Sequence, residues 1–117
     1  MQSMTPFEPG DVVLVPFPFT DFSTFKQRPC VVLSSTDFNR SHEDVILAAI
    51  TSQLNDHPTT DEYILSKQEQ IIAGLPKLSM VKVGKIVTVD QRLIRKSLGR
   101  LPVTSVRRLR KLVHHII

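Results

Sequence analysis

A single arginine beside an apolar segment is the first candidate for chemistry in this chain. Arg28 stands where a polar loop enters the β-branched segment that Pro29 begins. A guanidinium presents a fork of N–H donors that fits the oxygens of a phosphate or a carboxylate. Arg28 could therefore bind a phosphate, or it could form an ion pair at the strand end with an acid such as Asp11 or Asp90.

Hydroxyl side chains also lie at the ends of predicted strands. Thr51 and Ser52 follow the apolar segment 47–50, and Ser35 ends the segment 30–35. A hydroxyl at a strand end can donate a hydrogen bond to a phosphate oxygen, or it can cap the turn that follows. The residue types leave both roles open.

Phenylalanines gather around the loop at residues 20–28. Phe17 and Phe19 alternate with other apolar residues, so we expect them in the core. Phe22 and Phe25 lie in the polar loop itself and are candidates for stacking on the bases of a single-stranded nucleic acid or for contact with a partner.

The sequence contains no recognisable metal or nucleotide motif. The histidines, His42, His57, His114 and His115, are not spaced with other ligand residues, and no glycine-rich phosphate loop is present. Any reaction is therefore expected to use side chains, without a metal or cofactor. Cys30, the only cysteine, is expected to be a small buried residue in a strand.

Length and composition predict a folded chain with one modest core. The 117 residues are 41% hydrophobic, which suits a single domain over residues 1–117. No apolar run approaches the ~20 residues that span a bilayer, and the start lacks a signal-peptide pattern, so we expect a cytoplasmic protein and no membrane. All 11 acidic residues lie before residue 91, whereas the segment 91–117 is basic and could attract nucleic acid or an acidic protein segment.

Hydrophobic periodicity predicts about five short strands. They are expected at 11–19, 30–35, 45–51, 62–65 and 78–90, with the last either continuous or divided at Gly84. We expect loops at 20–28 and 54–61 and short helical turns at 36–39 and 91–96.

Two helices have recognisable ends. Ser66 and Glu69 form a capping-box pattern before a short helix at 67–73, which Gly74 ends. An amphipathic helix is expected at 103–116, capped by Thr104 or Ser105. A mainly β fold with appended helices follows, built as a small, strongly bent antiparallel sheet or barrel with a C-terminal amphipathic helix.

Four blocks of this sequence resemble the MazF/PemK family of bacterial toxins. They are Gly10-Asp11-Val12-Val13, Arg28-Pro29-Cys30-Val31-Val32-Leu33-Ser34, Ile50-Thr51-Ser52 and a looser block over 78–90. Their order and spacing hold over roughly residues 8–115. The resemblance implies an SH3-like small barrel, as in CcdB, MazF and PemK, and a homodimer. It also implies a toxin of a type II toxin–antitoxin system that cleaves single-stranded RNA, such as mRNA, at specific sequences without a metal.

The resemblance assigns roles to individual residues. The family's catalytic arginine falls on Arg28 and its catalytic threonine on Thr51. Candidates for binding RNA are Ser52, Lys26, Phe22 and Phe25. Cleavage without a metal uses the 2′-hydroxyl of the RNA as nucleophile and leaves a 2′,3′-cyclic phosphate and a 5′-hydroxyl. His57 or Asp21 could serve as the base.

The chain departs from the family pattern at the expected substrate groove. The loop 20–27 lacks the glycine and glutamate common in better-known members, and Ala49 stands where many relatives have proline. The cleavage sequence is therefore not transferable from those members. A partner is expected in an antitoxin with an acidic, partly disordered tail.

Two further interpretations do not involve cleavage. The barrel could block a protein target such as a topoisomerase, as CcdB proteins do, because small barrels host many functions. Alternatively, it could bind nucleic acid through its C-terminal arginines, and its affinity would then fall steeply with salt.

Overall fold

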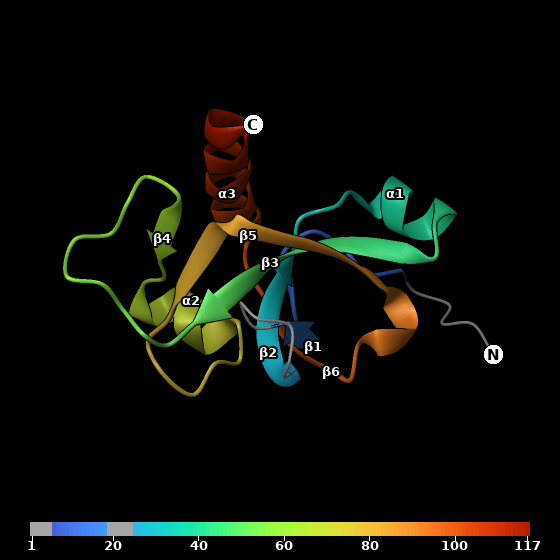
Figure 1. The fold of residues 1–117 in the computed structure, drawn as a ribbon, viewed down its shortest axis with the longest axis horizontal. Helices are drawn as coiled ribbons and strands as arrows, with labels where there is room; N and C mark the ends of the chain where they lie inside the picture. Colours follow the sequence, from blue (N-terminus) through green and yellow to red (C-terminus); the bar gives the residue numbers. More distant parts are fainter. Residues whose placement is uncertain (1–5, 19–24) are drawn as a thin grey trace.

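In the part of the chain that the structure describes, six antiparallel strands form one bent sheet. The structure is a computed structural model that describes residues 6–18 and 25–117. The strands are β1 (Asp11–Pro18), β2 (Phe25–Val32), β3 (Asp44–Thr51), β4 (Glu62–Ile64), β5 (Met80–Asp90) and β6 (Lys96–Arg100). Their order is β4-β5-β3-β2-β1-β6, so β4 and β6 are the edges of a sheet that does not close. Figure 1 shows β3 and β5 crossing the upright pair β1 and β2, which confirms the predicted strong bend.

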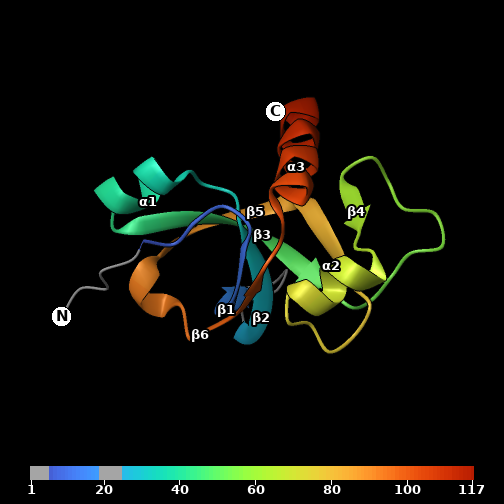
Figure 2. The same ribbon diagram turned by 180° about the vertical axis from the view of Figure 1, so that it is seen from behind.

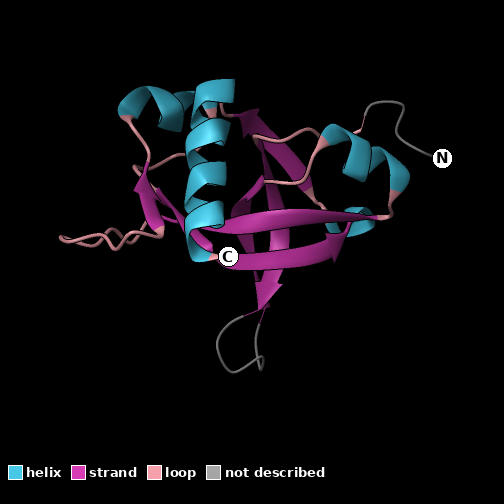
Figure 3. Cartoon of the chain, turned by 90° about the horizontal axis from the view of Figure 1, so that it is seen from above, coloured by secondary structure: helices cyan, strands magenta, loops and turns pink. Residues whose placement is uncertain are grey.

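Helices pack around this sheet. They are α1 (Thr36–Ser41), α2 (Lys67–Ile72), the single 3₁₀ turn η1 (Gln91–Leu93) and α3 (Val103–Ile116). α3 contacts β5, and seen from above it lies across the long strands with its C-terminal end exposed (Figure 3). None of the helices in the described part of the chain has the length and apolar character needed to cross a lipid bilayer.

Alternation along the strands divides the buried apolar side chains between the two faces of the sheet. Val12 belongs to a cluster that also includes Leu109 of α3, whereas the neighbouring Val13 belongs to a second cluster on the other face. Phe17 packs against the second cluster, as expected. Cys30 lies in it with no exposed surface, and burial raises the pKa of its thiol to about 12. The thiol therefore remains protonated at neutral pH, which agrees with a structural role for this residue.

The predicted start of the second strand is wrong. Residues 25–28 were expected in a polar loop, but β2 begins at Phe25 and pairs with β1 over its whole length, from Pro18 opposite Phe25 to Val12 opposite Val31. The backbone of this segment pairs with the apolar strand β1. This pairing favours a strand although the side chains of the segment are polar. Pro29 is accommodated inside the strand because there β2 pairs with β1 and has not yet joined β3.

The strand β6 was not predicted. The segment 96–100 contains one large apolar residue, Leu98, and therefore has no hydrophobic alternation typical of a strand. It forms an edge strand along β1, with Asp11 opposite Arg100 and Leu14 opposite Lys96. Figure 2 shows β6 beside β1 from behind. An edge strand needs few apolar residues, because much of its surface meets water.

The capping prediction is confirmed for α2 and wrong for α3. Ser66 and Glu69 form the predicted capping box, and Gly74 follows the helix with φ 73°. The first residue outside α3 is Pro102, which makes no side-chain capping bond. Ser105 is instead buried, and its hydroxyl donates to Oε2 of Glu69, which joins α3 to α2. This distant acceptor explains why the local capping pattern was misleading.

Candidate active site

A pocket of about 280 Å³ opens where β3 ends. It combines cationic, amide, hydroxyl and apolar side chains. Its described lining residues are Phe17, Arg28, Ala49, Ile50, Thr51, Gln53, Asn55, Met80, Lys82 and Lys85. Both residues to which the resemblance assigns catalytic roles, Arg28 and Thr51, therefore belong to one pocket.

The register of the sheet brings Arg28 and Thr51 together. β2 and β3 pair with Cys30 opposite Ala49, and the ladder ends there. Continued by two residues, the same register sets Arg28 opposite Thr51. Directly opposite residues on neighbouring antiparallel strands lie on the same face of a sheet. Residues 23 positions apart in the sequence thus meet at one site.

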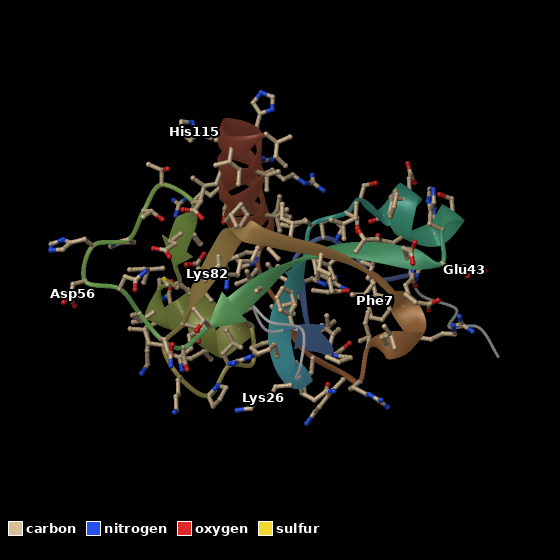
Figure 4. All side chains as sticks on the ribbon, in the orientation of Figure 1. Phe7, Lys26, Glu43, Asp56, Lys82 and His115 are labelled. Atoms are coloured by element: carbon tan, nitrogen blue, oxygen red, sulfur yellow. The ribbon has the colours of Figure 1, made fainter. Side chains whose placement is uncertain are left out.

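A bulge between β3 and β5 adds two lysines. Ala49 lies opposite Lys82, but the preceding Ala48 lies opposite Ile86, so the register shifts between them. Extra residues in a bulge change the direction of the side chains there. Lys85, inside the extra segment, lines the pocket together with Lys82. Figure 4 shows Lys82 on β5 near the end of β3.

The lining is cationic. Arg28, Lys82 and Lys85 contribute positive charge, and no carboxylate is among the described lining residues. Glu62 lies behind the pocket wall, with Oε2 3.3 Å from Nζ of Lys82 and only 5% of its side chain exposed. A cluster of cations and amides of this kind suits an anion such as a phosphate group.

Glu62 is held as a carboxylate by several donors. The backbone N–H of Thr59 lowers its pKa most, followed by the amide of Asn55, and Lys82 lowers it further, to about 2. The hydrogen-bond lengths are 3.0 Å from Thr59 N and 2.9 and 3.0 Å from Asn55 Nδ2. Glu62 therefore stays ionised at neutral pH. It accepts hydrogen bonds from Asn55 and forms an ion pair with Lys82, and both of these residues line the pocket.

The hydroxyl of Thr51 is oriented by the backbone that follows it. Its Oγ1 accepts a hydrogen bond of 3.1 Å from the backbone N–H of Gln53. The hydroxyl thus caps the next turn, one of the two roles expected from sequence. Since a hydroxyl has a proton as well as lone pairs, Thr51 can still donate to an oxygen in the pocket.

The acids considered as ion-pair partners of Arg28 bind other arginines. Asp11 accepts from Nε of Arg100 at 2.5 Å. Asp90 accepts from Arg92, with Nη2 2.8 Å from Oδ2. Arg28 and Thr51 share the lining of the pocket.

Lys26, Ser52 and His57 are not among the described lining residues. Lys26 is exposed near the start of β2 (Figure 4), and Ser52 is exposed directly after β3. His57 is exposed in the loop between β3 and β4. Asp21 and Phe22 lie outside the described residues, and for Phe25 only the backbone is described. The roles proposed for these residues stay predictions.

Four polar lining residues were missed by the sequence analysis: Gln53, Asn55, Lys82 and Lys85. One signal was available, because Lys82 alternates with Met80 along a predicted strand and a lysine on an otherwise apolar face needs a reason. The two amides gave no comparable signal within a polar loop.

Within residues 6–18 and 25–117 no group of three or more His, Cys, Asp or Glu side chains is arranged to hold a metal ion.

Comparison with known proteins places this chain in a family. Residues 8–117 match the family model of the PemK-like, MazF-like toxins of type II toxin–antitoxin systems. The chain belongs to this PemK/MazF toxin family. The resemblance found in the sequence is thereby confirmed over nearly the whole chain. Comparison with curated proteins gives no significant match.

Several solved structures share the fold of this chain at low sequence identity. An endoribonuclease from a mycobacterial species matches with a TM-score of 0.75 and 14% identity, covering 97% of this chain and 93% of that chain. A mycobacterial endoribonuclease in complex with its cognate antitoxin gives 0.74 and 14%, with 93% and 92% covered. A MazE–MazF complex from Deinococcus radiodurans gives 0.73 and 19%, with 94% of each chain covered. The predicted family fold is confirmed, and in this chain it takes the form of the strongly bent antiparallel sheet rather than a closed barrel.

Proposed function

We propose that this PemK/MazF toxin is a sequence-specific endoribonuclease that cleaves single-stranded RNA without a metal ion. The observation that carries the proposal is the meeting of Arg28 and Thr51 in one cationic pocket. Two structures of the same fold are named endoribonucleases, which supports this activity. A lining of cations, amides and a hydroxyl favours a phosphate over a divalent cation.

The proposed reaction is attack by the 2′-hydroxyl of the RNA on the neighbouring phosphorus. The new bond between O2′ and phosphorus forms as the bond to the 5′-oxygen of the next nucleotide breaks. Arg28 stabilises the additional negative charge on the phosphorane with fixed N–H donors. Thr51 donates a hydrogen bond to a non-bridging oxygen and keeps its proton. The products are a 2′,3′-cyclic phosphate and a 5′-hydroxyl.

Proton transfer needs groups besides this pair: a base that takes the proton of the 2′-hydroxyl and an acid that gives a proton to the leaving 5′-oxygen. A guanidinium stays protonated at neutral pH, so Arg28 is better suited to binding charge than to accepting the 2′-hydroxyl proton. Asp21 and His57 remain the predicted bases. Replacing each by its uncharged or non-basic counterpart, Asp21→Asn and His57→Gln, identifies the one that contributes.

A partner and a dimer belong to the proposal. Two structures of this fold contain an antitoxin, which supports an antitoxin as partner of this toxin. We expect its acidic tail to lie over the cationic pocket and to compete with RNA there. A homodimer in the cytoplasm is the expected working form.

The proposal predicts that purified protein cuts single-stranded RNA in the presence of EDTA. Arg28→Ala should reduce the cleavage rate by at least ~100-fold, because the main donor to the phosphorane is lost. Arg40→Ala is the matched control, since Arg40 lies exposed on α1 and its contact is a surface ion pair with Asp37. The control should cut at the rate of the unaltered protein.

The ends of the products test the mechanism. We expect a 2′,3′-cyclic phosphate on one product and a 5′-hydroxyl on the other. The cyclic phosphate is detected by its removal with the phosphatase activity of polynucleotide kinase. Cleavage only after addition of Mg²⁺, or equal rates for Arg28→Ala and Arg40→Ala, would contradict the proposal. Circular dichroism checks that both variants are folded.

A further inference from the structure

The side-chain amide of Asn55 is oriented by the carboxylate behind the pocket wall. Nδ2 of Asn55 lies 2.9 Å from one oxygen of Glu62 and 3.0 Å from the other. An ionised carboxylate accepts hydrogen bonds and cannot donate them, so it selects the NH₂ end of the amide. The carbonyl Oδ1 is therefore the end with which Asn55 can accept a hydrogen bond from a ligand in the pocket that it lines.

Glu62 is itself firmly placed. It lies on β4 opposite Lys82 of β5, and their side chains form an ion pair of 3.3 Å. The backbone N–H of Thr59 donates to Oε1 at 3.0 Å. The carboxylate therefore holds two residues of the loop between β3 and β4 and one residue of the neighbouring strand.

The far end of the same loop is tied to β5. The backbone N–H of Val83 donates to the carbonyl of Asp61 at 2.8 Å, and the N–H of Glu62 donates to the carbonyl of Thr59 at 3.0 Å. The loop is exposed and polar, yet these contacts hold it against the sheet. The orientation of Asn55 is thus set before a ligand arrives, which favours selective binding.

We propose that Asn55, oriented by Glu62, reads one base of the RNA by accepting a hydrogen bond from an exocyclic amino group. The inference rests on the proposed function, because it assumes that single-stranded RNA enters this pocket. Cytosine carries an amino group where uracil carries a carbonyl oxygen, and adenine carries one where guanine carries a carbonyl oxygen. Asn55 Oδ1 binds the amino group and repels the carbonyl. Glu62 is a positioning residue that acts through Asn55.

Cytosine and uracil give the sharpest comparison, because they have similar size and stacking. The probes are octamers of cytidine and of uridine, both 2′-O-methylated, which cannot be cleaved through the 2′-oxygen. Their dissociation constants are measured by fluorescence anisotropy at one salt concentration. The unaltered protein should bind the cytidine octamer about fivefold more tightly than the uridine octamer, the effect of one hydrogen bond.

Three variants test the source of this preference. Asn55→Ala should bring the ratio of the two dissociation constants close to one. Glu62→Gln should reduce or invert it, because a glutamine amide can donate to Oδ1 and let Asn55 turn its NH₂ group toward the ligand. Glu43→Gln is the matched control, since Glu43 is exposed and lies at the opposite end of the molecule from Lys82 (Figure 4). It should keep the fivefold ratio.

The outcomes separate this inference from the nuclease proposal. Equal weakening of both octamers by Glu62→Gln, or an unchanged ratio in Asn55→Ala, would overturn base reading even if the protein cuts RNA. The predicted ratios in a protein that fails to cut unmodified RNA would support base reading and refute the nuclease. Asn55 is exposed, so Asn55→Ala remains an informative variant if Glu62→Gln does not fold.

Discussion

At the scale of single residues, the pocket supplies hydrogen-bond donors. Arg28 has a guanidinium, which donates and never accepts. Thr51 accepts from the backbone N–H of Gln53 at 3.1 Å, so one of its two lone pairs is occupied and its proton is available to donate. A site made of such groups binds negative charge, and it binds best where that charge increases during a reaction.

This view of Thr51 can be tested with a substitution of equal shape. Thr51→Val removes the hydroxyl and keeps the branched side chain, and we expect the single-turnover cleavage rate to fall about 100-fold. Thr51→Ser keeps the hydroxyl and should stay within about tenfold of the original rate. Equal rates for the valine and serine variants would show that the hydroxyl does not act on the RNA.

At the scale of elements, the site depends on how β3 is joined to its neighbours. Its register with β2 brings Arg28 to Thr51, and its bulge with β5 adds Lys85. A second contact between elements joins the helix α2 to the edge strand β6. The backbone directly after α2 lies close to the backbone of β6. A Cβ on Gly74, directly after α2, would lie 2.0 Å from the carbonyl oxygen of Leu98 in β6.

Gly74→Ala is therefore expected to destabilise the fold. The residue has φ 73°, which L side chains rarely adopt, and the added methyl group collides with backbone. We expect a loss of about 2 kcal/mol or more in the free energy of unfolding, measured in urea. The matched control is Gly84→Ala, where the new Cβ meets the movable carboxylate end of Asp61. It should lose less than about 1 kcal/mol, and a similar loss in both variants would contradict the role of the α2–β6 contact.

At the scale of the whole molecule, charge is distributed differently from what the sequence implied. The basic segment 91–117 uses some of its charge internally, since Arg92 binds Asp90 and Arg100 binds Asp11. The cations of the pocket come from the first 90 residues, which are acidic on balance. The remaining cations of α3 are exposed on a helix that stands away from the loop carrying Asp56 (Figure 4).

The salt dependence of RNA binding distinguishes these two sources of charge. Each phosphate contact on a single strand contributes about 0.7 to the slope of log affinity against log salt concentration. Lys85→Gln, in the pocket, should lower the slope for the cytidine octamer by about that amount. Lys111→Gln, on α3, should leave it unchanged. A larger effect of Lys111→Gln would favour the interpretation in which the C-terminal cations bind nucleic acid.

Much of this protein follows from the sequence alone. The continuous apolar run at 45–51 and the alternation over 78–90 predicted β3 and β5, and Ser66 with Glu69 predicted the capping box of α2. The spacing of Leu109 with its apolar neighbours predicted α3. These features depend on residues close together in the chain, so local side-chain patterns are enough to specify them. The motifs around Arg28 and Thr51, which indicated the family, are also short runs of residues that are adjacent in the chain.

Tertiary structure alone decided how the site is assembled. β6 became a strand because β1 offered it a partner more than 80 residues away in sequence. The shift in register between β3 and β5 selected Lys85, and the carboxylate of Glu62 selected which end of Asn55 can accept from a ligand. Pairing register and amide orientation depend on hydrogen bonds between distant segments, and no local pattern of residue types encodes those partners.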